Sequence, residues 1–293
     1  MMPLRDILLA LAIVVVWGVN FVAIRWGVDE IPPLLLTSLR YVVAAVPAVF
    51  FIRRPQVSLP ILVGYGLAVG VGQFGLLFTA IKFGMPAGLS SLVIQLQAFF
   101  TIALAVLFLG ERPRGAQLLG AFVALAGIAL IAAERLGGAA LWPFLMTIAA
   151  GACWGLANLL TKKAGRVDML GFVVWSSLVP PIPLYLLSLL FEGPGAVGVA
   201  LGQITWLGIG SLLFIGWVST VFGYGAWSVL LGRYPASTVA PFTLLVPIVG
   251  ILAAMLILGE RTTGLELAGS AIVFAGLLLN VFGPRLFARS AAA

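Results

Sequence analysis

Ten apolar stretches, each about the length of a membrane-spanning helix, constrain the fold of this 293-residue chain more than any other feature. A helix that crosses a bilayer needs about 20 mostly apolar residues. The stretches are Ile7–Trp26, Leu34–Phe51, Leu59–Ala80, Ala87–Leu109, Gly115–Ala133, Leu141–Thr161, Leu170–Phe191, Thr205–Leu231, Ala236–Leu258 and Gly264–Phe282. Apolar residues run continuously within them rather than alternating, which favours helices over a β-barrel. The sequence therefore predicts an all-α integral membrane protein with ten transmembrane helices.

The composition excludes a soluble globular domain. Hydrophobic residues make up 62% of the chain and charged residues 9%, whereas a soluble domain carries about 25% charged residues. The first stretch follows Arg5, but it is longer than a usual signal-peptide core and no A-x-A cleavage site follows it, so we expect a retained span. The single cysteine, Cys153, falls inside a predicted helix and excludes an intramolecular disulfide.

The basic residues indicate membrane topology rather than nucleic-acid binding. With the N-terminus placed inside, 11 Lys and Arg residues fall on the cytoplasmic side and 4 on the opposite side, with Arg40 inside a span. The cytoplasmic residues are Arg5, Arg53, Arg54, Arg112, Arg114, Lys162, Lys163, Arg166, Arg233, Arg285 and Arg289. The opposite residues are Arg25, Lys82, Arg135 and Arg261. This asymmetry follows the positive-inside rule and predicts that both termini are cytoplasmic.

The chain also repeats itself. Four motifs recur: Pro86-Ala87 as Pro235-Ala236 and Leu109–Arg112 as Leu258–Arg261, both at an offset of 149, Gly120 and Gly127 as Gly269 and Gly276, and Trp17-Gly18 with Asn20 as Trp154-Gly155 with Asn158. A repeat of five spans crosses the membrane an odd number of times, so the second copy enters from the other side. We therefore predict two inverted five-helix repeats, residues 1–137 and 138–293, joined near Leu136-Gly137-Gly138 around a central cavity. The repeated glycines predict close packing of the fifth and tenth spans.

Polar and aromatic residues at helical spacing indicate a pathway through the bundle. Trp17 and Asn20 share one face of the first span, and Trp154 and Asn158 share one face of the sixth. Because an amide in hydrocarbon must find a partner, both Asn side chains should face the bundle interior. They can bind a polar ligand between aromatic walls. The alternative is that Asn only joins helices and Trp anchors them at the membrane interface.

Arg40 is the only basic residue placed well inside a span. A cation at that depth needs water, an anion or helix carbonyls, so it is a candidate partner for a substrate carboxylate. Snorkelling of its side chain toward the outer surface is the competing interpretation.

The remaining candidates are weaker individually. Gln95 and Gln97 are two residues apart and cannot share a helical face, so at most one should contact a ligand. The other candidate contacts are Gln73, Trp175, Ser176, Tyr224 and Trp227. Prolines that interrupt the second, seventh and ninth spans are candidate gates, although they can equally accommodate curvature; they are Pro47, Pro180, Pro181, Pro183, Pro241 and Pro247.

The absences are informative too. The sequence has no histidine, which excludes an imidazole proton relay and a His-ligated metal, and we expect no metal or cofactor. No Asp or Glu falls at mid-membrane, and Glu111 and Glu260 fall at helix ends beside arginine. Because a proton antiporter usually needs a titratable group in its pathway, facilitative transport is the better expectation.

Several motifs together resemble the EamA family of the drug/metabolite transporter superfamily. They are Val16–Phe21, Pro86–Ser91, both Leu-Gly-Glu-Arg motifs, Gly223–Gly225, Leu231–Tyr234 and Asn280–Gly283. The resemblance covers all ten spans and is closest to bacterial exporters of amino acids and their metabolites. It implies inverted repeats, a central cavity, alternating access and an inner-membrane location, with Trp17, Asn20 and Arg40 at positions typical of the family.

The resemblance does not fix the substrate, because the wider superfamily also carries nucleotide sugars, triose phosphates and cationic drugs. The small multidrug branch uses a glutamate in its first helix, and this chain has no acid between Asp6 and Asp29. We expect an amino-acid or metabolite exporter that works as a monomer in the lipid bilayer. Drug efflux, a non-transporting scaffold and a membrane-embedded enzyme are the alternatives.

Overall fold

The computed structural model describes residues 2–135, 141–165 and 167–290, which form helices joined by short connections without a strand among them. In this part of the chain, nine helices are long and apolar enough to cross a membrane. The remaining predicted stretch, Leu34–Phe51, forms the 17-residue helix α2 (Pro33–Val49). It is shorter than expected because Pro32 and Pro33 fix its start and Pro47 removes a hydrogen bond near its end. The predicted joint at residues 136–138 lies outside the described residues.

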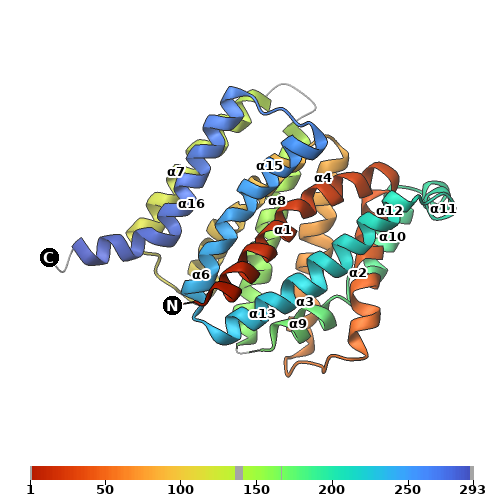
Figure 1. Ribbon diagram of the computed structural model, residues 1–293, viewed down its shortest axis with the longest axis horizontal. Coiled ribbons are helices and arrows are strands. Elements are labelled where there is room, and N and C mark those ends of the chain that lie inside the picture. Colours follow the sequence, from red (N-terminus) through yellow and green to blue (C-terminus); the bar gives the residue numbers. More distant parts are fainter. Residues whose placement is uncertain (1, 136–140, 166, 291–293) are drawn as a thin grey trace.

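Some spans are continuous helices and others change their winding on the way (Figure 1). The continuous ones are α1 (Leu4–Glu30), α2, α7 (Gly115–Arg135), α8 (Leu141–Ala164) and α16 (Gly264–Ser290). The third span consists of α3 (Leu59–Gly66), η1 (Leu67–Gly75) and α4 (Leu76–Lys82), and the fourth of α5 (Ala87–Val93), η2 (Ile94–Leu96) and α6 (Gln97–Leu109). The seventh consists of α9 (Met169–Ser176) and α10 (Pro181–Phe191), followed by the short helix α11 (Pro194–Gly202). The eighth consists of α12 (Trp206–Leu213), η3 (Phe214–Phe222) and α13 (Gly223–Arg233), and the ninth of α14 (Ala236–Val239), η4 (Ala240–Leu245) and α15 (Val246–Leu258).

The irregular segments fall at corresponding places in the two halves of the chain. Segments η1 and η3 are nine-residue π-helical stretches whose starts lie 147 residues apart, and η2 and η4 are 3-10 segments in the following spans. Gly110 and Gly259 both end their helices in the left-handed conformation, with φ of 66° and 67°. Because π-helix is rare, its recurrence extends the sequence repeat to the backbone. Hydrophobic patterning does not reveal this winding, and we did not expect it.

The prolines predicted to interrupt spans do so in two of the three cases. The seventh span breaks between α9 and α10 at Pro180 and Pro181, and the ninth winds as η4 around Pro241 before Pro247 opens α15. Pro47 does not interrupt the second span, because α2 continues through it to Val49. A proline so close to a helix end leaves few downstream turns to bend.

Helix α1 packs against α15, α12, η3, α13, α4 and α5, while α8 packs against η1, α3, α4 and α6. Helices α7 and α16 lie side by side at the edge of the molecule (Figure 1). The small faces predicted on these two helices meet each other, since a methyl group added at Gly120 or Gly127 would lie 2.6 Å from the carbonyl oxygen of Gly276 or Gly269 respectively. Only glycine permits so close an approach of two helix backbones.

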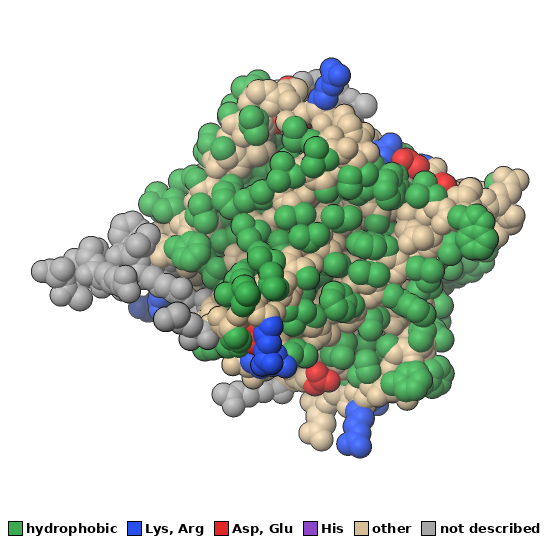
Figure 2. Space-filling view, viewed as in Figure 1, with side chains coloured by type: hydrophobic (Ala, Val, Ile, Leu, Met, Phe, Trp, Pro, Cys, Tyr) green, Lys and Arg blue, Asp and Glu red, His purple; other side chains and the backbone are tan. Residues whose placement is uncertain are grey.

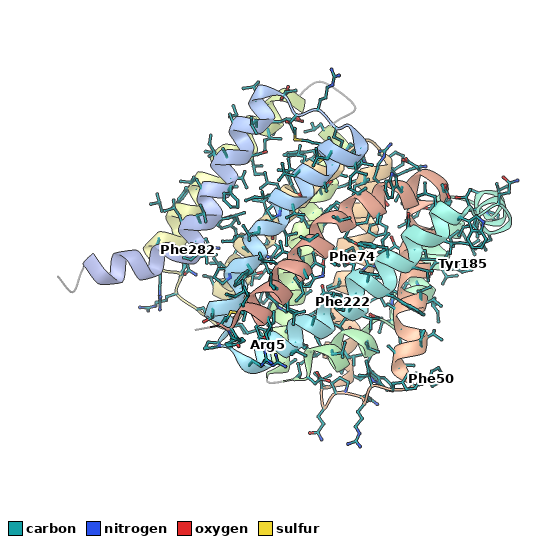
Figure 3. All side chains as sticks on the ribbon, viewed as in Figure 1. Arg5, Phe50, Phe74, Tyr185, Phe222 and Phe282 are labelled. Atoms are coloured by element: carbon teal, nitrogen blue, oxygen red, sulfur yellow. The ribbon has the colours of Figure 1, made fainter. Side chains whose placement is uncertain are left out.

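Apolar side chains cover the face of the molecule seen in Figure 2, and charged side chains gather around its rim. Large exposed apolar residues include Phe50, Phe122, Leu190 and Trp206. Of the residues labelled in Figure 3, Tyr185 and Phe222 are exposed, whereas Phe74 is partly buried against the apolar core. A continuous apolar surface of this kind is stable against lipid and not against water, which fits a multi-pass membrane protein.

Candidate functional site

A cavity of about 280 Å³ lies inside the bundle. Nine of the eleven predicted contact residues line it: Trp17, Asn20, Arg40, Gln73, Gln95, Trp154, Asn158, Tyr224 and Trp227. They come from six spans that are distant in the sequence. The structure therefore brings together most of the residues that the sequence singled out.

Aromatic side chains form one wall of this cavity. The ring centroid of Trp17 lies 5.5 Å from that of Tyr224 and 5.3 Å from that of Trp227. The indole Nε1 of Trp17 donates to the backbone oxygen of Ser219, at 3.0 Å, in the π-helical segment η3. Since that polar group is already bonded, Trp17 presents ring surface to a ligand rather than a hydrogen-bond donor.

The two repeated asparagines differ in their bonding. Asn158 donates through Nδ2 to the side-chain oxygens of Gln97 and Thr101, at 2.5 and 3.0 Å, and so joins the sixth span to the fourth. Asn20 is buried, and its Oδ1 has no hydrogen-bond partner among the described residues. The same holds for Oε1 of Gln73. Asn158 thus joins helices as well as lining the cavity, whereas Asn20 and Gln73 leave acceptor oxygens unused.

Gln95 and Gln97 both line the cavity, although regular α-helical spacing would place them on different faces. Segment η2 winds as a 3-10 helix over Ile94–Leu96, so the regular α-helical spacing that separates the two faces does not hold there.

Arg40 points into the protein and does not snorkel to the surface. Its residue surface is only 2% exposed. Nη2 donates to Thr220 Oγ1 at 2.9 Å, and the guanidinium carbon lies 3.9 Å from the ring centroid of Phe74, a cation–π contact. Nε and Nη1 have no hydrogen-bond partner in the described part of the chain. A buried cation in this condition is costly unless an anion reaches it.

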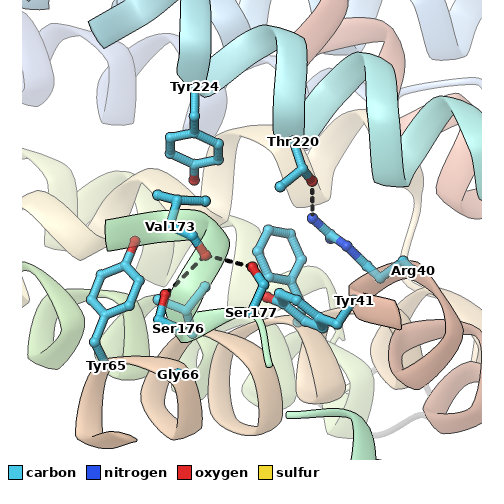
Figure 4. Close-up of a pocket in the computed structure, with 11 residues that line it drawn as sticks. Arg40, Tyr41, Tyr65, Gly66, Val173, Ser176, Ser177, Thr220 and Tyr224 are labelled. Carbon is cyan, nitrogen blue, oxygen red and sulfur yellow. Dashed lines mark hydrogen bonds between the residues drawn. The ribbon is translucent and has the colours of Figure 1, made fainter. Parts of the chain in front are cut away.

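Trp175 and Ser176 lie outside the main cavity, and this is where the structure departs from the predicted set. The indole Nε1 of Trp175 donates to the backbone oxygen of Ile52 at 2.9 Å, which ties the seventh span to the connection after α2. Ser176 lines a small adjoining chamber with Arg40 and Thr220 (Figure 4). Adjacent helical residues point about 100° apart, and here Trp175 and Ser176 face different surroundings.

Sequence reasoning missed several residues at this site. Tyr41, Tyr65, Phe74 and Thr220 line one or both of the two spaces. Tyr41 follows Arg40 directly, and Thr220 stands 147 residues after Gln73, the offset that separates η1 from η3. That correspondence is the signal that could have found Thr220.

The described cavity lining contains a single charged side chain, that of Arg40. Within the described residues, no group of three or more Cys, Asp or Glu side chains could hold a metal ion. The electrostatics of the site are therefore those of one cation among neutral amides, hydroxyls and rings.

The cavity extends toward the end of the bundle that holds the N-terminus, where Thr161, Met169 and Leu231 line it. Toward the opposite end, Ile24 and Leu77 of its wall belong to a buried apolar cluster. That cluster also contains Val28, Leu36 and Ile81, which are almost fully inaccessible. Apolar packing thus closes the site at the end opposite the N-terminus.

A cavity that places one cation and several amides among aromatic and apolar side chains, inside a bundle of apolar helices, is typical of a membrane transporter of small solutes. The chain belongs to the EamA-like transporter family, whose family model matches residues 4–133 and 141–282. This confirms the resemblance seen in the sequence.

Two bacterial relatives are similar over nearly their whole length. The "Probable amino-acid metabolite efflux pump" of Salmonella typhimurium is 47% identical over 291 residues, and the protein of that name in Escherichia coli is 45% identical over 290 residues, each covering 97% of both chains. A solved crystal structure matches with a TM-score of 0.61 and 18% identity, covering 94% of this chain and 95% of the other. The structural likeness supports the fold alone.

Proposed function

We propose that this protein exports amino acids or related small metabolites across the inner membrane by alternating access. Its bacterial relatives carry the name of amino-acid metabolite efflux pumps at 45–47% identity. The cavity volume of about 280 Å³ lies just below the range of about 300–1,000 Å³ typical for drug-sized ligands. A small metabolite fits in a cavity of this size.

The observation that carries the proposal is the pairing of unused donors and acceptors in one cavity. Arg40 leaves two guanidinium nitrogens free, and Asn20 and Gln73 leave amide oxygens free, all of them buried. A zwitterion satisfies both sets, because its carboxylate binds the guanidinium and its ammonium donates to amide oxygens. Trp17, Trp154, Tyr224 and Trp227 then surround the side chain. A cationic substrate meets only the positive charge of Arg40 and is disfavoured.

The architecture we propose is ten spans in two inverted repeats, residues 1–137 and 138–293, with both termini cytoplasmic. Support comes from the recurrence of sequence motifs, of the π-helical segments η1 and η3, and of the left-handed caps Gly110 and Gly259. With this orientation the cavity opens to the cytoplasm, and the cluster around Val28 and Ile81 closes the outer side.

Two carboxylates latch the outer side in this arrangement. Glu260 accepts from the backbone nitrogens of Ala87 and Gly88 at 2.7 and 3.0 Å, at the start of α5. Glu192 accepts from Leu34 and Leu35 at 2.7 and 3.2 Å, at the start of α2. Each carboxylate comes from the second half of the chain and caps a helix N-terminus of the first half, a favourable pairing with the helix dipole.

The repeat equivalent of Glu260 behaves differently. Glu111 forms an ion pair with Lys162, at 2.5 Å, on the surface of the cytoplasmic end. The glutamates of the two Leu-Gly-Glu-Arg motifs therefore have different partners: Glu260 caps a helix of the other half, and Glu111 does not. In the outward-facing state we expect the roles to exchange, with Glu111 capping α14 and Glu260 released. The breaks at Pro180, Pro181, Pro241 and Pro247 are candidate hinges for this motion.

Uptake of radiolabelled L-amino acids into liposomes with the purified protein tests this proposal, with and without a pH gradient. We expect saturable uptake that is insensitive to the gradient and is lost in Arg40→Gln. The matched control is Arg261→Gln, outside the cavity, which should transport normally. Folded wild-type protein that moves no amino acid would contradict the proposal.

A further inference from the structure

A second, smaller chamber adjoins the main cavity behind Arg40 (Figure 4). Its volume is about 10 Å³, room for about one water-sized group. It shares Arg40, Tyr65, Phe74 and Tyr224 with the lining of the main cavity. The two spaces are therefore direct neighbours on either side of these side chains.

Six residues that line the chamber carry a hydroxyl, and the three that are serine or threonine are already bonded inside the protein. Ser176 and Ser177 both donate to the backbone oxygen of Val173, at 3.0 and 2.6 Å. Thr220 Oγ1 donates to the backbone oxygen of Ile215 at 2.9 Å. These serine and threonine protons are thus unavailable to a ligand.

The hydroxyl of Tyr41 differs from these. It is buried and has no hydrogen-bond partner among the described residues, and the ring of Tyr41 lies 5.0 Å from the guanidinium carbon of Arg40. The chamber therefore combines an unused phenol with a cation that has two unused nitrogens, and its described lining contains no acid. A carboxylate binds where hydrogen-bond donors and a cation are available and no negatively charged side chain repels it.

Thr220 fixes the direction of the cation. It accepts from Arg40 Nη2 while its own proton goes to Ile215, five residues earlier. Hydrogen bonds in a π-helix join residues that are five apart, so the π-helical winding of η3 sets the position of the Thr220 hydroxyl. Phe74 of η1 covers the guanidinium at 3.9 Å. The two π-helical segments, one from each half of the chain, thereby hold Arg40 between them.

We propose that this chamber is the subsite for the substrate carboxylate, with Tyr41 as a specificity-determining residue and Thr220 as a positioning residue for Arg40. The inference rests on the proposed function and deepens it. One carboxylate oxygen of the substrate enters the chamber, and the rest of the substrate lies in the main cavity among the tryptophans. The protein then requires a free carboxylate and tolerates different apolar side chains.

Kinetics of liposome uptake test the subsite, using the neutral L-amino acid that the wild type transports fastest. Tyr41→Phe and Thr220→Val should each raise KM about tenfold, the loss of one hydrogen bond to a charged group, with little change in the maximal rate. Thr220→Ser keeps the hydroxyl and should restore the wild-type KM. Tyr185→Phe, on the lipid-facing surface (Figure 3), is the matched control and should have no effect.

Competition on the wild type gives a second measurement. The amide of the same amino acid, and the amine that lacks the carboxylate, should compete at least tenfold less well than the acid. Unchanged KM in both folded variants, or equal competition by acid and amide, would overturn the subsite while leaving the exporter intact. No uptake of any amino acid by the wild type would instead overturn the proposed function and the subsite with it.

Discussion

Replacing Glu260 with glutamine should loosen the outer side of the protein. The Glu260 carboxylate accepts two backbone hydrogen bonds, from Ala87 and Gly88, at the N-terminus of α5. A hydrogen bond to a charged group contributes about 1.5–3 kcal/mol, and glutamine keeps one neutral oxygen for the two donors. The change therefore costs the latched state about one charge-assisted bond, which shifts the ratio of latched to released protein by about 10- to 150-fold.

Thiol labelling can measure this shift. In a Cys153→Ser background, Val28→Cys places a reporter in the apolar cluster that closes the outer side, where Val28 is fully buried. Maleimide labelling of the detergent-solubilised protein should be slow, and Glu260→Gln should accelerate it about 10- to 150-fold. The acceleration reaches its limit when the reaction of the exposed thiol, rather than the opening of the protein, sets the labelling rate. The melting temperature of each variant, compared with that of the Cys153→Ser, Val28→Cys protein, shows whether the variant is folded.

Glu111→Gln is the matched control because it makes the same chemical change in the other copy of the motif. Glu111 pairs with Lys162 while both side chains are about half exposed, and exposed pairs contribute only about 0–1 kcal/mol. This variant should leave labelling of residue 28 unchanged or slower. Equal acceleration by both variants, or none by Glu260→Gln in folded protein, would refute the latch.

Two further predictions concern stability and are read as melting temperatures of the purified protein. Gly127→Ala should destabilise the α7–α16 pair, because the added methyl group lies 2.6 Å from the Gly269 carbonyl oxygen. Gly115→Ala is the control and should not destabilise the protein, because the space around Gly115 is open. Equal melting temperatures of the two variants would contradict the close packing at Gly127. Asp6→Asn should lower the melting temperature by about 5 °C, since the buried Asp6 carboxylate accepts from Arg233 and Tyr234 and joins the start of α1 to the end of α13. An unchanged value would show that this junction does not contribute to stability.

Patterning alone predicted the helical class, the positions of the nine described helices that are long and apolar enough to cross a membrane, and nine residues that line the cavity. Trp17, Asn20, Trp154 and Asn158 could be placed inside because amides and indoles recur at helical spacing in otherwise apolar stretches. The pattern could not place Trp175, because helical spacing gives the face of a residue but not what lies opposite that face. In the structure a backbone oxygen of Ile52 meets it.

The sequence by itself determined that this chain is a membrane-embedded helical protein of the EamA-like family with recurring motifs, since hydrophobic length, motif recurrence and family similarity are all properties of the linear chain. Only the tertiary structure decided which charged side chains are buried and which partners they have. It buried Arg40 between η1 and η3 instead of letting it snorkel, and it gave identical Glu-Arg motifs different partners. The physical reason is that burial and pairing depend on neighbours from distant spans, which no local pattern encodes.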